Sequence, residues 1–245
     1  MDPLAQPPDA PRESSLDRVQ ALLEVLLVSG LLTGLLASLP FSLRPGAQGA
    51  VPLKADSLSG YILLEAALTL LLLVLLLRSR RETLTDIGLR WHKWRSDAVV
   101  GVALVPLMFA TGAAVTFLFR VFAPDQLMVR NPLMDTIQTP GDLVLFLLSA
   151  LVAGGLKEEL QRAFVITRFA RFLGGAALGL VLWSVAFGAG HYMQGIQGVV
   201  TAFVFGMLLG AAYLARGGLV TPIVAHALYD VLTLAAFWLT RSSRV

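Results

Sequence analysis

Three short segments in the second half of the chain combine carboxylates with imidazoles. They are Lys157-Glu158-Glu159-Leu160-Gln161-Arg162, Phe187 to His191, and His226 to Asp230. A glutamate can take a proton from a water molecule, while imidazoles and a second carboxylate hold that water or stabilise an oxyanion. Residue types and spacing together therefore predict a site for hydrolytic chemistry.

The spacing within the segments places partners on common helical faces. His226 and Asp230 are four residues apart, as are Glu158 and Arg162, and side chains at this spacing are neighbours on a helix. The chain has three histidines, and the one outside these segments, His92, lies in a basic loop where we expect it to be solvated.

The elements that must position these residues are membrane helices. Of 245 residues, 56% are hydrophobic and 14% are charged, against about 25% charged in soluble domains. A span needs about 20 apolar residues. We predict an all-α polytopic membrane bundle of seven or eight transmembrane helices over 21–245, after a disordered tail at 1–20, with a loop at 122–140. The apolar runs are 21–41, 60–77, 98–119, 142–156, 174–193, 197–215 and 219–239.

A buried ionisable group in a membrane is costly, so by default it faces the bundle interior and has a partner. We therefore expect Glu158, His191, His226 and Asp230 to share one polar cavity. Straight spans, however, would place His226 near the cytoplasmic side and His191 near the opposite side. A fifth helix that starts late, after the glycines at 174, 175 and 179, would remove this difference in depth.

Charge and cysteine content narrow the classes of protein further. The net charge of +3 comes mainly from loops, and no aromatic-rich basic stripe indicates nucleic-acid binding. The segment 78–95 holds six basic residues, and the segment 162–171, Arg216 and the N-terminus fall on the same side if seven spans are counted. The positive-inside bias places that side in the cytoplasm. Cysteine is absent, so disulfides, thiolate catalysis and cysteine metal sites are excluded.

At these residues the chain resembles the CPBP family of intramembrane proteases, the CAAX-processing and bacteriocin-processing enzymes also called Abi proteins. That family carries a glutamate pair followed by Arg, then Phe-x-x-x-His, then His-x-x-x-Asn or Asp. The second and third motifs fit here, and the resemblance covers about 140–240. The family commonly has three residues between the glutamate pair and Arg, whereas only Leu160 and Gln161 intervene in this chain.

The resemblance implies an intramembrane endopeptidase in which a glutamate activates water. Its usual base is the first glutamate, which favours Glu158 and leaves Glu159 as the alternative. His191, His226 and Asp230 would hold the water and the tetrahedral intermediate, and Arg162 would support the carboxylate.

No cofactor is required on this interpretation, although a zinc-dependent version, with His191 and His226 as ligands, stays open. A non-catalytic scaffold or a proton-coupled transporter is the alternative from another class, because buried His and Glu also serve as proton relays. The expected partners are the lipid bilayer and a peptide or membrane-protein substrate, and the expected location is a bacterial cytoplasmic membrane with the N-terminus in the cytoplasm.

Overall fold

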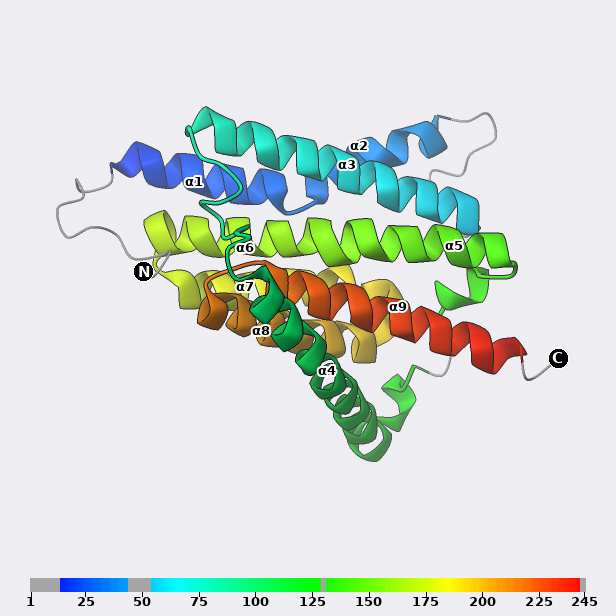
Figure 1. The fold of residues 1–245 in the computed structure, drawn as a ribbon. Coiled ribbons are helices and arrows are strands. Elements are labelled where there is room, and N and C mark those ends of the chain that lie inside the picture. The colour runs from blue at the N-terminus through cyan, green and yellow to red at the C-terminus, as the bar shows by residue number, and fades with distance from the viewer. Residues whose placement is uncertain (1–13, 44–53, 129–130, 243–245) are drawn as a thin grey trace.

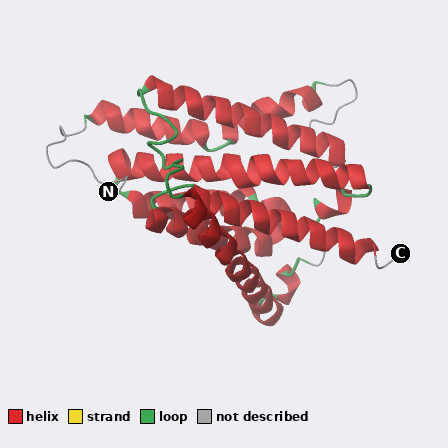
Figure 2. Ribbon diagram, in the orientation of Figure 1, coloured by secondary structure: helices red, strands yellow, loops and turns green. Residues whose placement is uncertain are grey.

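The computed structural model describes residues 14–43, 54–128 and 131–242, which contain helices and connecting loops and no β-strand (Figure 2). Two segments, η3 and η4, are π-helical, and three single turns, η1, η2 and η5, are 3₁₀-helical. The elements are α1 (Ser15–Val28), α2 (Leu31–Ser42), α3 (Ala55–Ser79), α4 (Trp94–Phe122), η1 (Pro124–Gln126), η2 (Met134–Thr136), α5 (Pro140–Ser149), η3 (Ala150–Glu158), α6 (Glu159–Arg168), η4 (Phe169–Leu173), α7 (Ala176–Gly190), η5 (Tyr192–Gln194), α8 (Gly195–Arg216) and α9 (Val220–Ser242).

The apolar runs of the sequence are helical, which confirms an all-α membrane bundle. Among the described residues, five helical segments are long and apolar enough to cross a membrane: Ser15–Ser42, Ala55–Ser79, Trp94–Phe122, Tyr192–Arg216 and Val220–Arg241. The helix α7 is apolar but shorter. Within its described part, the stretch 122–140 contains only the turns η1 and η2 before α5, as expected for a loop.

The first helix begins earlier than the sequence analysis placed it. The predicted tail covers 1–20, but α1 already starts at Ser15, and the rest of that tail, 1–13, lies outside the described residues. A capping box explains the early start, because the Ser14 side chain accepts from the Asp17 backbone N–H and the Asp17 carboxylate accepts from the Ser14 N–H. The boundary at residue 20 was therefore wrong for the last residues of the tail.

One long helix carries the glutamate pair through the bundle. The elements α5, η3, α6 and η4 follow one another without interruption from Pro140 to Leu173 and form a single rod in Figure 1. The apolar run ends at 156, and the basic residues of 162–171 were predicted to lie at the end of the span with the loop charges. That prediction was wrong, because Arg162 and Arg168 are fully buried in α6. The helix continues because buried acidic partners offset the charge of both guanidinium groups.

The basic segments gather at one end of the bundle, as predicted from their charges. Glu24 of α1 pairs with Arg80 at 2.6 Å and with Arg168 at 2.5 Å. Glu82, in the loop after α3, pairs with Arg168 at 2.7 Å and with Arg171 at 2.6 Å. These ion pairs join α1, the loop that follows α3 and the end of the long helix. The cytoplasmic location of this end stays a prediction.

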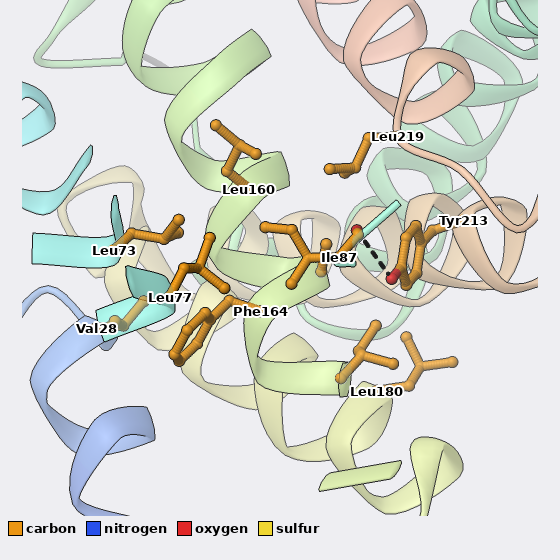
Figure 3. Close-up of a cluster of buried hydrophobic side chains, with 11 residues drawn as sticks. Val28, Leu73, Leu77, Ile87, Leu160, Phe164, Leu180, Tyr213 and Leu219 are labelled. Atoms are coloured by element: carbon orange, nitrogen blue, oxygen red, sulfur yellow. Dashed lines mark hydrogen bonds between the residues drawn. The ribbon is translucent and has the colours of Figure 1, made fainter. Parts of the chain in front are cut away.

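Apolar side chains from five helices meet beside the glutamate pair (Figure 3). Phe164 of α6 is fully buried in the same cluster as Leu77 of α3 and Val28 of α1. On the other side of α6, the Tyr213 hydroxyl donates to the Ile87 carbonyl at 3.1 Å, the bond drawn dashed in Figure 3. The cluster fixes the rotation of α6, and thereby the direction in which its polar residues point.

Helices of the second half approach one another closely at glycine residues. A Cβ added at Gly206 of α8 would lie 3.0 Å from the backbone of Ser184 on α7. One added at Gly188 of α7 would lie 2.8 Å from the Val199 carbonyl on α8. In a bilayer the lipid tails are as apolar as the side chains, so little hydrophobic driving force holds helices together. Close approach at glycines stabilises the bundle through van der Waals contact instead.

Candidate active site

The two glutamates differ sharply in their surroundings, although they are adjacent in the chain. Glu158 is the last residue of the π-helical segment η3, and Glu159 is the first residue of α6. The Glu159 side chain is completely buried, whereas 22% of the Glu158 side chain is exposed. Of the two carboxylates, only that of Glu158 is therefore open to solvent or substrate.

Glu159 holds the neighbouring charged and aromatic groups in place. It forms an ion pair with Arg162, one turn further along α6, and neither side chain has any exposure. Its other oxygen, Oε1, lies 2.7 Å from Nδ1 of His226 on α9. Because a carboxylate only accepts hydrogen bonds, Nδ1 carries the proton in this contact and the imidazole orientation is fixed. Arg162 thus supports Glu159 and not Glu158.

The opposite ring nitrogen of His226 faces two further carboxylates. Its Nε2 atom is 3.9 Å from Oε2 of Glu158 and 3.7 Å from Oδ2 of Asp230. Both distances are too long for a direct hydrogen bond, and at such separations two polar groups can share a bridging water. His226 therefore separates a buried ion pair on its Nδ1 side from a more open polar space on its Nε2 side.

His191 lies beside this group at the end of α7. Its Nδ1 atom is 2.7 Å from the Phe187 carbonyl oxygen. A carbonyl oxygen can only accept a hydrogen bond, so Nδ1 carries the proton and donates it, and Nε2 takes no part in this bond. The centroid of the Phe187 ring is 4.6 Å from that of the His191 ring and 6.0 Å from that of the His226 ring, so Phe187 packs against both imidazoles.

The predicted difference in depth between the histidines is removed because the long helix continues to Leu173 before the chain turns back; α7 itself starts at Ala176, close to the predicted 174. Gly174 and Gly175 both have φ of 105°, a conformation that favours glycine, and they reverse the chain between η4 and α7. Glu158 and His191 are separated from this reversal by nearly equal lengths of helix. The two antiparallel helices therefore bring them to the same level of the bundle.

Two glycines let α9 approach the long helix at the site. A Cβ added at Gly154 would lie 2.5 Å from Oδ2 of Asp230, and one at Gly155 would lie 2.8 Å from Cβ of Ala227. A larger side chain at either of these two positions would push α9, and with it His226, away from the glutamates. The sequence analysis did not identify this contact, since helical spacing alone does not show which faces of two helices meet.

The sequence analysis also missed a buried ion pair next to Glu158. Lys157 has a side chain only 10% exposed, and its Nζ atom lies 2.9 Å from Oε2 of Glu65 on α3. Glu65 stood out in the sequence as the single charge of an otherwise apolar run, a signal that called for a partner. That partner is Lys157, which does not point outward toward the headgroups.

The site thus brings together Glu158, Glu159, His226 and Asp230, with His191 adjacent, from α6, α7, α9 and η3. Among the residues that the structure describes, no three His, Asp or Glu side chains are grouped so that they could hold a metal ion.

An all-α bundle of membrane-type helices, in which one buried and one partly exposed glutamate face a histidine, defines the class to which the chain belongs, that of polytopic membrane proteins with a polar site between their helices. Within this bundle, residues 139–232 match the family model of type II CAAX prenyl endopeptidase Rce1-like proteins. The match runs from the start of α5 into α9, covers every residue of the site, and is consistent with the CPBP family of CAAX proteases. It indicates a membrane protease of the CAAX type. No curated protein and no solved structure matches the chain.

Proposed function

We propose that this protein is an intramembrane endopeptidase in which Glu158 activates a water molecule. The observation that carries the proposal is the difference in burial and contacts between the two glutamates. Glu159 is neutralised by Arg162 and fixes the His226 ring. Glu158 faces Nε2 of that ring at 3.9 Å and Nζ of Lys157 at 3.8 Å, and among the described residues neither contact is short enough for a hydrogen bond. A general base needs an available carboxylate near the water from which it takes a proton.

In the proposed reaction, Glu158 takes a proton from a water held by Nε2 of His226 and by Asp230. The water oxygen bonds to the scissile carbonyl carbon, and the carbonyl oxygen becomes an oxyanion. Nε2 of His226 keeps its contact with the oxygen that came from water. Nδ1 of His191 is engaged by the Phe187 carbonyl, so His191 in its imidazolium form donates Nε2–H to the oxyanion. Glu158 then passes its proton to the amide nitrogen, the C–N bond breaks, and an acid and an amine leave.

The test is cleavage of peptides by the purified protein in detergent or vesicles. Suitable probes are a quenched fluorescent peptide that ends in a farnesylated CAAX sequence, its unprenylated form, and a peptide library. A general base contributes roughly 10²–10⁴-fold, so we expect Glu158→Gln to lower kcat by that factor with folding intact. Full kcat in Glu158→Gln would rule out Glu158 as the base.

Chelation separates the metal-dependent version of the hydrolase from the one proposed. We expect cleavage to persist after treatment with 1,10-phenanthroline and analysis of the purified protein to find substoichiometric zinc. Loss of cleavage on chelation, restored by added zinc, would favour the metal-dependent version. If the wild-type protein cleaves no peptide, that result would favour the alternative function as a non-catalytic scaffold or a proton-coupled transporter.

A further inference from the structure

The buried ion pair between Lys157 and Glu65 connects the first half of the chain to the candidate base. Lys157 precedes Glu158 in η3, and Glu65 lies midway along α3. Both residues are 8% exposed, and their charged atoms are 2.9 Å apart. An ammonium at this depth is costly unless it is paired, so Glu65 determines where the Lys157 side chain can lie.

Glu65 is itself held by two hydroxyl groups. Its Oε1 atom accepts from Thr69 of the same helix at 2.8 Å and from Thr33 of α2 at 3.1 Å. Both threonines are buried, and their hydroxyl oxygens are 2.7 Å apart. With Oε1 occupied in this way, the other oxygen of Glu65 is directed to Lys157. The ammonium is therefore fixed by a network that spans α2, α3 and η3.

The fixed ammonium makes a second contact, with the candidate base. Nζ of Lys157 is 3.8 Å from Oε1 of Glu158, while Oε2 of Glu158 is 3.9 Å from Nε2 of His226. The carboxylate of Glu158 thus lies between a cation on one side and the imidazole on the other. Attraction of Oε1 by Lys157 turns Oε2 toward His226, where the attacking water would bind.

A second contact anchors the same segment to the first half of the chain. Helix α1 ends at Val28 and α2 begins at Leu31, and Nε2 of Gln161 donates to the Val28 carbonyl at 2.6 Å. This bond satisfies a carbonyl that the helix end leaves without an intrahelical partner. Residues on both sides of the glutamate pair, Lys157 and Gln161, therefore contact the N-terminal helices.

We propose that Lys157 is a positioning residue for Glu158, anchored by Glu65, so that α2 and α3 are part of the catalytic apparatus. The proposal rests on the proposed function, because it takes Glu158 to be the base. The competing explanation is that Lys157 and Glu65 only hold helices together, in which case any pair of opposite charges at the two positions would serve.

Substitutions that separate position, charge and helix pairing test this proposal. We expect Lys157→Met to lower kcat for the quenched CAAX peptide by about 10²-fold at unchanged KM, the loss typical of a reacting group displaced by about 1 Å. Lys157→Arg should restore most of the activity. Glu65→Gln, which keeps an acceptor for the threonines but loses the charge, should lower kcat in the same way.

The exchanged pair is the decisive variant. Glu65→Lys combined with Lys157→Glu restores an ion pair between the helices, yet it places a carboxylate beside Glu158. Lys at position 65 cannot accept from the two threonines, so we expect the exchange to raise Tm above that of Glu65→Gln and Lys157→Met without reaching the wild type, and not to recover kcat. A matched control is Asp97→Asn, which breaks an ion pair of α4 with Arg216 of α8 outside the site and should lower stability with kcat unchanged. If the exchanged protein does not fold, the test is the kcat of Lys157→Met and Lys157→Arg, compared at equal folded fraction. A low kcat in the first variant and a largely restored kcat in the second would support the positioning role.

The failure of this inference is distinguishable from failure of the proposed function. Wild-type kcat in Lys157→Met, or recovery of kcat in the exchanged pair, would overturn the positioning role while an inactive Glu158→Gln leaves the proposed function standing. Wild-type kcat in Glu158→Gln would overturn both.

Discussion

Replacing Glu159 by Gln should separate the glutamate proposed to hold the site together from the one proposed as the general base. The Glu159–Arg162 pair has no exposure on either side chain, and two nitrogens of Arg162, Nε and Nη2, already lack a hydrogen-bond partner among the described residues. Gln keeps an oxygen that can accept from Nδ1 of His226, so the substitution removes the charge and little else. It leaves the Arg162 guanidinium buried without a counter-ion.

The expected cost follows from this burial. Removing one partner of a buried ion pair costs about 3–5 kcal/mol, because the remaining charge is uncompensated. In a chain of this size each kcal/mol shifts Tm by about 2–4 °C, so we expect Glu159→Gln to unfold about 6–20 °C below the wild type. Glu158 is partly exposed and has only longer contacts, so Glu158→Gln should cost below about 1 kcal/mol.

Thermal unfolding of the two variants in the same detergent, followed by the fluorescence of the four tryptophans, measures the difference. The double variant Glu159→Gln with Arg162→Met removes both charges and should recover much of the lost stability, since replacing a whole buried pair by apolar groups is often neutral. Unfolding of Glu159→Gln within about 2 °C of the wild type would refute the reasoning. A further loss on adding Arg162→Met would show that the uncompensated guanidinium is not the cause.

Two further predictions concern packing and topology. Gly154→Ala inserts a methyl group against Asp230, so it should lower the free energy of unfolding by about 1–3 kcal/mol and also lower kcat. At Gly190 an added Cβ meets nothing within 4 Å, so the control Gly190→Ala should change neither quantity. Equal effects of the two substitutions on Tm and kcat would contradict the close approach of α9. The basic loop that follows α3 is predicted to be cytoplasmic. A cysteine introduced at the exposed Ser79 should therefore resist an impermeant thiol reagent in intact cells and react after permeabilisation. Labelling in intact cells would show that the topology is the opposite of the predicted one.

The sequence by itself determined the class of fold and the residues that could do chemistry. The chain consists largely of apolar runs, and only 14% of its residues are charged, which indicates a membrane protein. Within a bilayer, a helix pairs the backbone N–H and C=O groups of each apolar run with one another. The four-residue spacing of His226 and Asp230 places them on one face wherever that helix packs. Both arguments are local, and so neither depends on which helices become neighbours.

Only the tertiary structure decided which glutamate is free and what holds it. Spacing arguments assume 3.6 residues per turn, and they barely separate Glu158 from Glu159. The chain is π-helical up to Glu158 and α-helical from Glu159, and the packing of the bundle leaves the first carboxylate partly exposed and the next fully buried. The partners of Lys157 and Glu159 come from α3 and α9, far away in the sequence, and long-range pairing of this kind depends on helix packing that no local pattern records.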